Sequence, residues 1–143
     1  QKLLILIIIG SIPLVIFGRS LGSALAITAA AEVRDACRLL VLQSPFLSAV
    51  RTRVPEGLMC MVRWADMFSN RVHLRNFPLS APLLVLHGEN DKVVPVEHGR
   101  ILVDEYEGGA RKKIEIHPTA GHNNMPPNWI LMEVSRYLHE LGI

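Results

Sequence analysis

The hydrophobic residues of this chain fall into short uninterrupted runs, and helix-forming or polar stretches separate the runs. Four buried strands are predicted in this way, at 14–17, 39–43, 83–87 and 114–117. Continuous rather than alternating hydrophobicity is typical of parallel strands that are covered on both faces. Since helical stretches separate these strands, we expect an α/β fold with three α/β/α layers and a mostly parallel sheet.

Helical periodicity predicts the elements that lie between and after the strands. In one of them, Ile101, Leu102 and Tyr106 are expected on one side of the helix. In the last one, apolar residues recur at intervals of mostly three or four residues, and Gly142 is expected to end the helix. The predicted helices are an alanine-rich stretch that runs to Ala31, then 96–106 and 128–141, with a further helical stretch around 58–68 inside the long segment 44–82.

Residues 1–12 form an atypical apolar N-terminal segment, in which Leu3 to Ile9 is uninterrupted hydrophobic sequence. A membrane span needs about 20 apolar residues, and a signal peptide needs a small-residue cleavage site before a polar start. Both of these alternatives fit the segment less well than a pair of strands, or a strand and a connector, that Pro13 separates.

Length, charge and cysteine content limit the classes of function. We expect residues 1–143 to form a single domain with its own core, N-terminally incomplete because no initiator methionine opens it. The formal net charge of +2 is too small to indicate a nucleic-acid partner. Cys37 and Cys60 form no Cys-x-x-Cys motif and share no metal-ligand spacing with a histidine. We therefore expect no metal, and a reducing, cytoplasmic compartment.

A Gly-x-Ser-x-Gly motif stands between the first predicted strand and the alanine-rich helix. Gly18 and Gly22 flank Ser20, as a sharp strand-to-helix turn requires, because a Cβ at either position would collide with neighbouring backbone. Such a turn holds the Ser20 hydroxyl above the carboxyl edge of the sheet. The amide of Leu21, at the positive end of the helix, is then placed to stabilise an oxyanion.

Two further groups follow later strands and are expected at the same sheet edge. Asp91 follows the third predicted strand and His122 follows the fourth. An imidazole can take the proton of a serine hydroxyl, and a buried carboxylate orients that imidazole, so Ser20, Asp91 and His122 suit a catalytic triad. Each residue taken alone also fits an ordinary turn residue. The rival acid, Asp66, lies in segment 44–82 and not after a strand.

Segment 44–82 concentrates large and adaptable apolar side chains near the expected mouth of the site. Core packing explains them, since methionine fills irregular gaps. The alternative is that some of them line a groove for a long acyl chain. The candidates for substrate binding are Phe46, Leu47, Met59 and Met61, beside Trp64 and Met67.

The chain resembles the C-terminal half of an α/β-hydrolase-fold serine hydrolase. It is most similar to the eukaryotic α/β-hydrolase-domain proteins whose animal members include palmitoyl-protein thioesterases (depalmitoylases). The resemblance implies Ser20 as nucleophile, Asp91 as acid and His122 as base, no cofactor, and an acylated protein or lipid-like ester as substrate. The motifs that carry it are Gly18–Ser23, Leu42–Arg51, Asp66–Phe68, the stretch from His87 to Pro95 with His98-Gly99, and Ala120–Asn123.

Departures from this family leave two functions open. A full domain of this kind also has strands before the nucleophile, which supply a second oxyanion donor, and we expect those strands to be absent here. The family's palmitoylated cysteine cluster, which implies peripheral association with the cytoplasmic face of membranes, is not found either. The chain is therefore either a serine hydrolase of long-chain esters or thioesters, or a truncated, inactive hydrolase that serves as a binding module.

The expected absence of those strands would leave the strand at Leu14 with a free edge. Gly10 to Pro13 give only a short link, whereas a parallel crossover needs about a dozen residues. We expect Leu3 to Ile9 to cover that edge as an antiparallel hairpin, or else to extend as an apolar helix.

Overall fold

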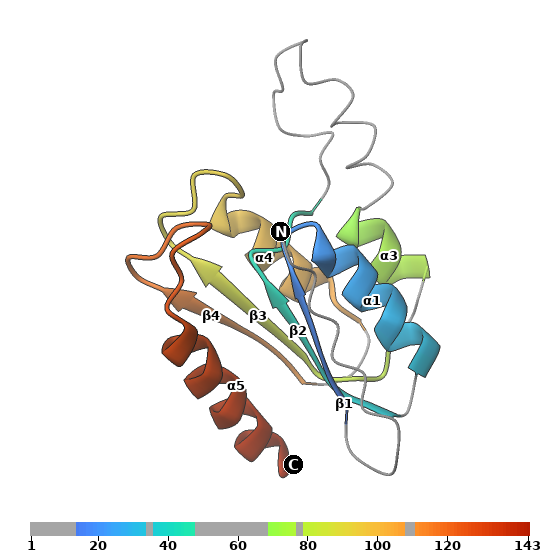
Figure 1. Cartoon of the computed structure of the whole chain (residues 1–143). Helices are drawn as coiled ribbons and strands as arrows, with labels where there is room; N and C mark the ends of the chain where they lie inside the picture. The colour runs from blue at the N-terminus through green and yellow to red at the C-terminus, as the bar shows by residue number, and fades with distance from the viewer. Residues whose placement is uncertain (1–13, 34–35, 48–68, 77–78, 108–110) are drawn as a thin grey trace.

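The computed structural model describes residues 14–33, 36–47, 69–76, 79–107 and 111–143. Strands and helices alternate along the chain, as the hydrophobic pattern predicts (Figure 1). The elements are β1 (Leu14–Arg19), α1 (Gly22–Val33), β2 (Cys37–Gln43), α3 (Asn70–Asn76), β3 (Leu83–Gly88), α4 (Val96–Glu105), β4 (Lys112–His117) and α5 (Pro127–Leu141).

The described sheet has four strands in the order β1-β2-β3-β4, and every neighbouring pair is parallel. The two inner strands, β2 and β3, are the most buried, because each is hydrogen-bonded on both sides and covered on both faces. Parallel pairing brings the carboxyl ends of all four strands to one edge, which is where the candidate side chains were expected.

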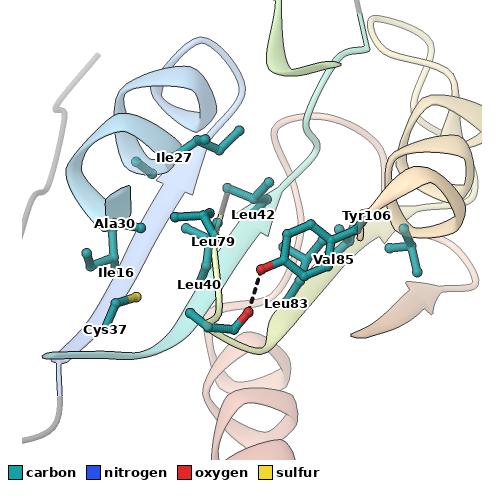
Figure 2. Close-up of a cluster of buried hydrophobic side chains, with 13 residues drawn as sticks. Ile16, Ile27, Ala30, Cys37, Leu40, Leu42, Leu79, Leu83, Val85 and Tyr106 are labelled. Atoms are coloured by element: carbon teal, nitrogen blue, oxygen red, sulfur yellow. Dashed lines mark hydrogen bonds between the residues drawn. The ribbon is translucent and has the colours of Figure 1, made fainter. Parts of the chain in front are cut away.

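One face of the sheet packs against α1, α3 and α4. Alternate strand residues point to this face, among them Leu40, Leu42 and Leu83, which are fully buried. Small residues such as Ala30 let α1 lie close to the strands (Figure 2). The Tyr106 hydroxyl donates to the backbone carbonyl of Ala81 at 2.5 Å, so the polar end of this buried ring is satisfied (Figure 2).

The opposite face packs against α5, which completes the third layer (Figure 1). Leu39, Val41 and Leu84 point to this side and are fully buried. The helix ends as the sequence predicts, because Gly142 adopts a left-handed conformation with φ of 75°. The predicted α/β/α architecture is confirmed.

Several local details differ from the sequence-based expectations. Ile101 is 38% exposed, so its expected place beside Leu102 and Tyr106 is wrong. The buried stripe of α4 is formed by residues three and four positions apart, among them Gly99, Leu102 and Val103, and Ile101 falls outside it. Helix α3 was not expected, and β4 begins two residues before Ile114. The expectations for Leu3 to Ile9 and for the helical stretch around 58–68 lie outside the described residues.

None of the helices among the described residues is both long enough and apolar enough to cross a bilayer.

Candidate active site

Ser20 lies at the sharp junction between β1 and α1, with a φ of 50° that a non-glycine residue rarely adopts. Its amide donates to the carbonyl of Gln43 at 2.9 Å, and its own carbonyl accepts from the Ser23 amide at 3.0 Å. A Cβ at Gly18 would lie 2.5 Å from the Cβ of Ala26, so only glycine lets β1 and α1 approach this closely. The junction is the strand-to-helix turn that the motif predicts.

Leu21 separates Ser20 from the first residue of α1, and its side chain is 47% exposed. Its backbone amide therefore belongs to the N-terminal end of the helix, where the partial charge is positive. That position is compatible with the expected oxyanion donor.

Asp91 is held in the turn that follows β3. Its Oδ1 accepts hydrogen bonds from the amides of Val93 at 2.9 Å and Val94 at 2.8 Å. Burial alone would raise the pKa of this carboxyl, but the Val94 amide, the His122 ring and the Val93 amide together hold its pKa below the ordinary value. The carboxylate is thus kept ionised, and its second oxygen, Oδ2, remains for another partner.

His122 follows β4 and bridges the other two residues. Its Nδ1 lies 2.8 Å from Oδ2 of Asp91, and its Nε2 lies 3.1 Å from Oγ of Ser20. Because an ionised carboxylate can only accept, the ring proton belongs on Nδ1, which leaves Nε2 to accept the serine proton. The hydrogen-bonding distances expected for Ser20, Asp91 and His122 are confirmed.

The loop that carries His122 is packed tightly against the end of β3. The Asn90 amide donates to the carbonyl of Ala120 at 3.0 Å. A Cβ at Gly88 would lie 2.3 Å from that same carbonyl oxygen, so the approach of the two loops depends on glycine. This packing couples the position of Asp91 to the position of His122.

Arg19 is a site residue that the sequence analysis did not identify. One of its guanidinium nitrogens, Nη2, donates to the backbone carbonyl of His122 at 3.0 Å and to Oδ1 of Asn123 at 2.7 Å. An exposed arginine beside a Gly-x-Ser-x-Gly motif is normally interpreted as a solvated side chain, so nothing in the pattern indicated this contact.

Of the candidate substrate-binding residues, Phe46 and Leu47 are both buried, at the end of the chain segment that follows β2. The Leu47 amide donates to Nδ1 of His98 at 3.1 Å, and the Asn70 side chain donates to the carbonyl of Phe46 at 2.7 Å. These bonds tie the segment to α4 and α3. Burial fits core packing and a groove wall equally. Met59, Met61 and the rival acid Asp66 lie outside the described residues.

Sequence comparison identifies relatives that are longer than this chain. The chain is 31% identical over 115 residues to the uncharacterized membrane protein YNL320W of Saccharomyces cerevisiae, covering 78% of this chain and 40% of that protein. It is 31% identical over 136 residues to human protein ABHD12B, covering 81% of this chain and 38% of that protein. The chain therefore spans about 40% of the length of these relatives.

Structure comparison finds the same fold in bacterial proteins. Est1E from Butyrivibrio proteoclasticus superposes with a TM-score of 0.66 at 21% identity, over 87% of this chain and 59% of that one. Thermogutta terrifontis esterase 2, in a form phosphonylated by sarin, superposes with a TM-score of 0.65 at 21% identity, over 90% of this chain and 56% of that one. At this identity the likeness establishes an α/β-hydrolase fold.

The sequence pattern of the prolyl oligopeptidase family matches residues 8–139, which is most of the chain. The parallel sheet, the serine at the turn after β1 and the order Ser, Asp, His along the chain agree with that match. The chain belongs to the prolyl oligopeptidase family and has the α/β-hydrolase fold of serine hydrolases.

Proposed function

We propose that this protein is a serine hydrolase that cleaves esters or thioesters through an acyl-enzyme on Ser20. The observation that carries the proposal is the continuous hydrogen-bonded chain from Asp91 through His122 to Ser20, with distances of 2.8 and 3.1 Å. It joins residues from three separate strand ends. A network that only stabilised the fold would not require a serine hydroxyl at its end.

In the acylation step, Nε2 of His122 takes the proton of Ser20 as Oγ attacks the carbonyl carbon of the substrate. The carbonyl electrons move onto oxygen, and the Leu21 amide faces the resulting oxyanion. When the tetrahedral intermediate collapses, the bond to the alcohol or thiol breaks and His122 returns the proton to that leaving group. Asp91 stays ionised throughout and stabilises the imidazolium that forms on His122.

Deacylation repeats these steps with water. His122 takes a proton from the water, the water oxygen attacks the acyl carbon, and the bond to Ser20 breaks as its Oγ regains the proton. A fatty acid leaves and the site returns to its starting state.

The substrate class that fits best is a long-chain acyl thioester on protein, with palmitoyl as the example. The resemblance to the depalmitoylase group supports this assignment, and the apolar side chains of Phe46 and Leu47 on the segment after β2 are compatible with it. One relative is called a membrane protein, which is compatible with a substrate that lies at the cytoplasmic face of a membrane. The protein would then act as a peripheral enzyme.

The second function is that of an inactive hydrolase that serves as a binding module. Serine hydrolases of this fold use a second oxyanion donor beside the amide of the residue after the nucleophile. Losing such a donor costs on the order of 100- to 1,000-fold in rate. A chain without it fits an inactive hydrolase that binds acylated partners without cleaving them.

Turnover measurements on acyl p-nitrophenyl esters and acyl thioesters of increasing chain length separate these functions. Replacing Ser20→Ala is expected to lower kcat by about three orders of magnitude or more. Ser44→Ala is the matched control, because Ser44 also directly follows a strand with a positive φ of 47° but is completely buried. A folded wild-type chain that gives no turnover would support the inactive alternative. Equal turnover by wild type and Ser20→Ala would exclude the proposed mechanism.

A further inference from the structure

His87 is a completely buried histidine that the proposed mechanism does not use. It is the fifth residue of β3, and its side chain has no exposed surface. Its Nε2 lies 2.9 Å from the carbonyl oxygen of Val94 and 3.5 Å from Oδ2 of Asp91. Asp91 Oδ2 is the same oxygen that accepts from His122, so two imidazoles converge on one carboxylate oxygen.

The partners of His87 determine its protonation. A carbonyl oxygen can only accept, so Nε2 carries the proton and donates it to Val94. Within the part of the chain that the structure describes, Nδ1 has no hydrogen-bond partner. Burial lowers the pKa of His87, although the Val94 carbonyl and the Asp91 charge oppose this effect; the nearby His122 and His98 lower it further. The ring is therefore neutral near pH 7 and presents a single N–H.

The far side of the ring is closed by α4. A Cβ at Gly99 would lie 2.8 Å from Nδ1 of His87 and 3.1 Å from Cγ1 of Val85. The imidazole is thus wedged between the helix and the turn that holds Asp91. Because no space remains behind it, the ring cannot withdraw its N–H from that turn.

We propose that His87 is a positioning residue for Asp91. Its Nε2–H donates to the Val94 carbonyl, and the same nitrogen lies 3.5 Å from Oδ2 of Asp91, so the ring fixes the turn from Asp91 to Val94 with Oδ2 facing Nδ1 of His122. The Val93 and Val94 amides hold Oδ1 of the carboxylate from one side, and His87 supports Oδ2 from behind. His87 transfers no proton and adds no charge.

This inference rests on the proposed function, in which Asp91 orients the catalytic histidine, and steady-state kinetics test it in the full chain. His87→Leu removes the N–H, and the expected result is a fall in kcat of about tenfold with KM nearly unchanged. His87→Gln retains an N–H that reaches the same acceptors and is expected to restore most of kcat. An unchanged kcat in His87→Leu would overturn the proposal, as would equal losses in both variants.

Nitrogen-15 NMR of the histidine rings gives a readout that does not depend on turnover. The proposal predicts that His87 of the wild-type chain is the neutral Nε2–H tautomer at pH 7, and that His87→Gln keeps the hydrogen-bonded Nδ1–H signal of His122 in place. His87→Leu is expected to shift or broaden that signal. A charged His87, an Nδ1–H tautomer, or a His122 signal unmoved in His87→Leu would overturn the proposal. If the wild-type chain hydrolyses no ester, the proposed function fails, but these spectra still decide whether His87 positions Asp91.

Discussion

The Nη2 of Arg19 donates to the backbone carbonyl of His122 at 3.0 Å, which joins the residue before Ser20 to the loop that follows β4. The same nitrogen donates to Oδ1 of Asn123 at 2.7 Å. The guanidinium is planar and rigid, so both contacts are made in one fixed geometry. Arg19 therefore restrains the His122 loop from the side of Ser20, while Gly88 lets β3 approach it from the other side.

Replacing Arg19→Met should lower kcat by about tenfold, because the loop loses two hydrogen bonds from a charged donor and His122 loses part of its alignment with Ser20. KM should change less, since Arg19 contacts the loop. Steady-state kinetics on a short-chain ester measure both constants.

Arg19→Lys is the matched control for charge. Lysine keeps the positive charge but not the planar group that reaches both acceptors, so we expect it to recover only a minor part of the lost kcat. Full recovery of kcat by lysine would mean that the charge of Arg19, and not the loop geometry, determines kcat. An unaltered kcat in Arg19→Met would show that Arg19 does not help to position His122.

Gly88→Ala should destabilise the fold by about 1–3 kcal/mol, because the new Cβ would overlap the carbonyl oxygen of Ala120 at 2.3 Å and backbone must move. The urea midpoint of unfolding measures this loss. Gly121→Ala in the same loop is the comparison, since its Cβ would meet the Asn90 carbonyl oxygen at the milder distance of 3.2 Å. A larger loss from Gly121→Ala than from Gly88→Ala would contradict the packing described for this loop.

Stability should fall in two steps as the pH is lowered. The pKa values of His87 and His98 are lowered mainly by burial, so below the ordinary value of 6.5 the unfolded chain binds protons that the folded chain does not. The free energy of unfolding should therefore decrease from that pH downward. Because the pKa of Asp91 is also lowered, a second decrease should begin below its ordinary value of 3.8.

Urea midpoints measured across this pH range test the assignment. His87→Gln should flatten the first step and leave the second unchanged, because only the histidine has been removed. Identical pH profiles for wild type and His87→Gln would show that His87 does not remain neutral in the folded chain as described.

The sequence predicts most of the fold because the strands are continuous apolar runs. Leu83 to Gly88 is fully buried, and such a segment has few alternatives to a central parallel strand. The close approach of β1 and α1 follows in the same way from Gly18, which no larger residue can replace. The three residues of the candidate site were found because each follows a strand, and parallel topology brings strand ends together.

Other features depend on contacts that no local pattern encodes. Helix α3 has no apolar periodicity, and Asn70 and Ser69 at its start donate to the carbonyls of Phe46 and Leu47. Arg19 meets its acceptors 103 and 104 positions along the chain. Of the site residues that the sequence did not predict, His87 was the easiest to find, because its spacing of four from Asp91 across a strand end is visible in the sequence.

Labelling with a fluorophosphonate probe tests the central claim most directly, because it requires Ser20 to act as a nucleophile. In this reaction Oγ of Ser20 forms a bond to phosphorus, fluoride leaves, and His122 takes the serine proton. Trypsin cleaves after Arg19, so the adduct should be found on the peptide that begins with Ser20, and fragmentation separates Ser20 from Ser23. We expect labelling of Ser20 in the wild-type chain, strong slowing in His122→Ala and no labelling in Ser20→Ala. Absence of an adduct on a folded wild-type chain, or an adduct that persists in Ser20→Ala, would contradict the account.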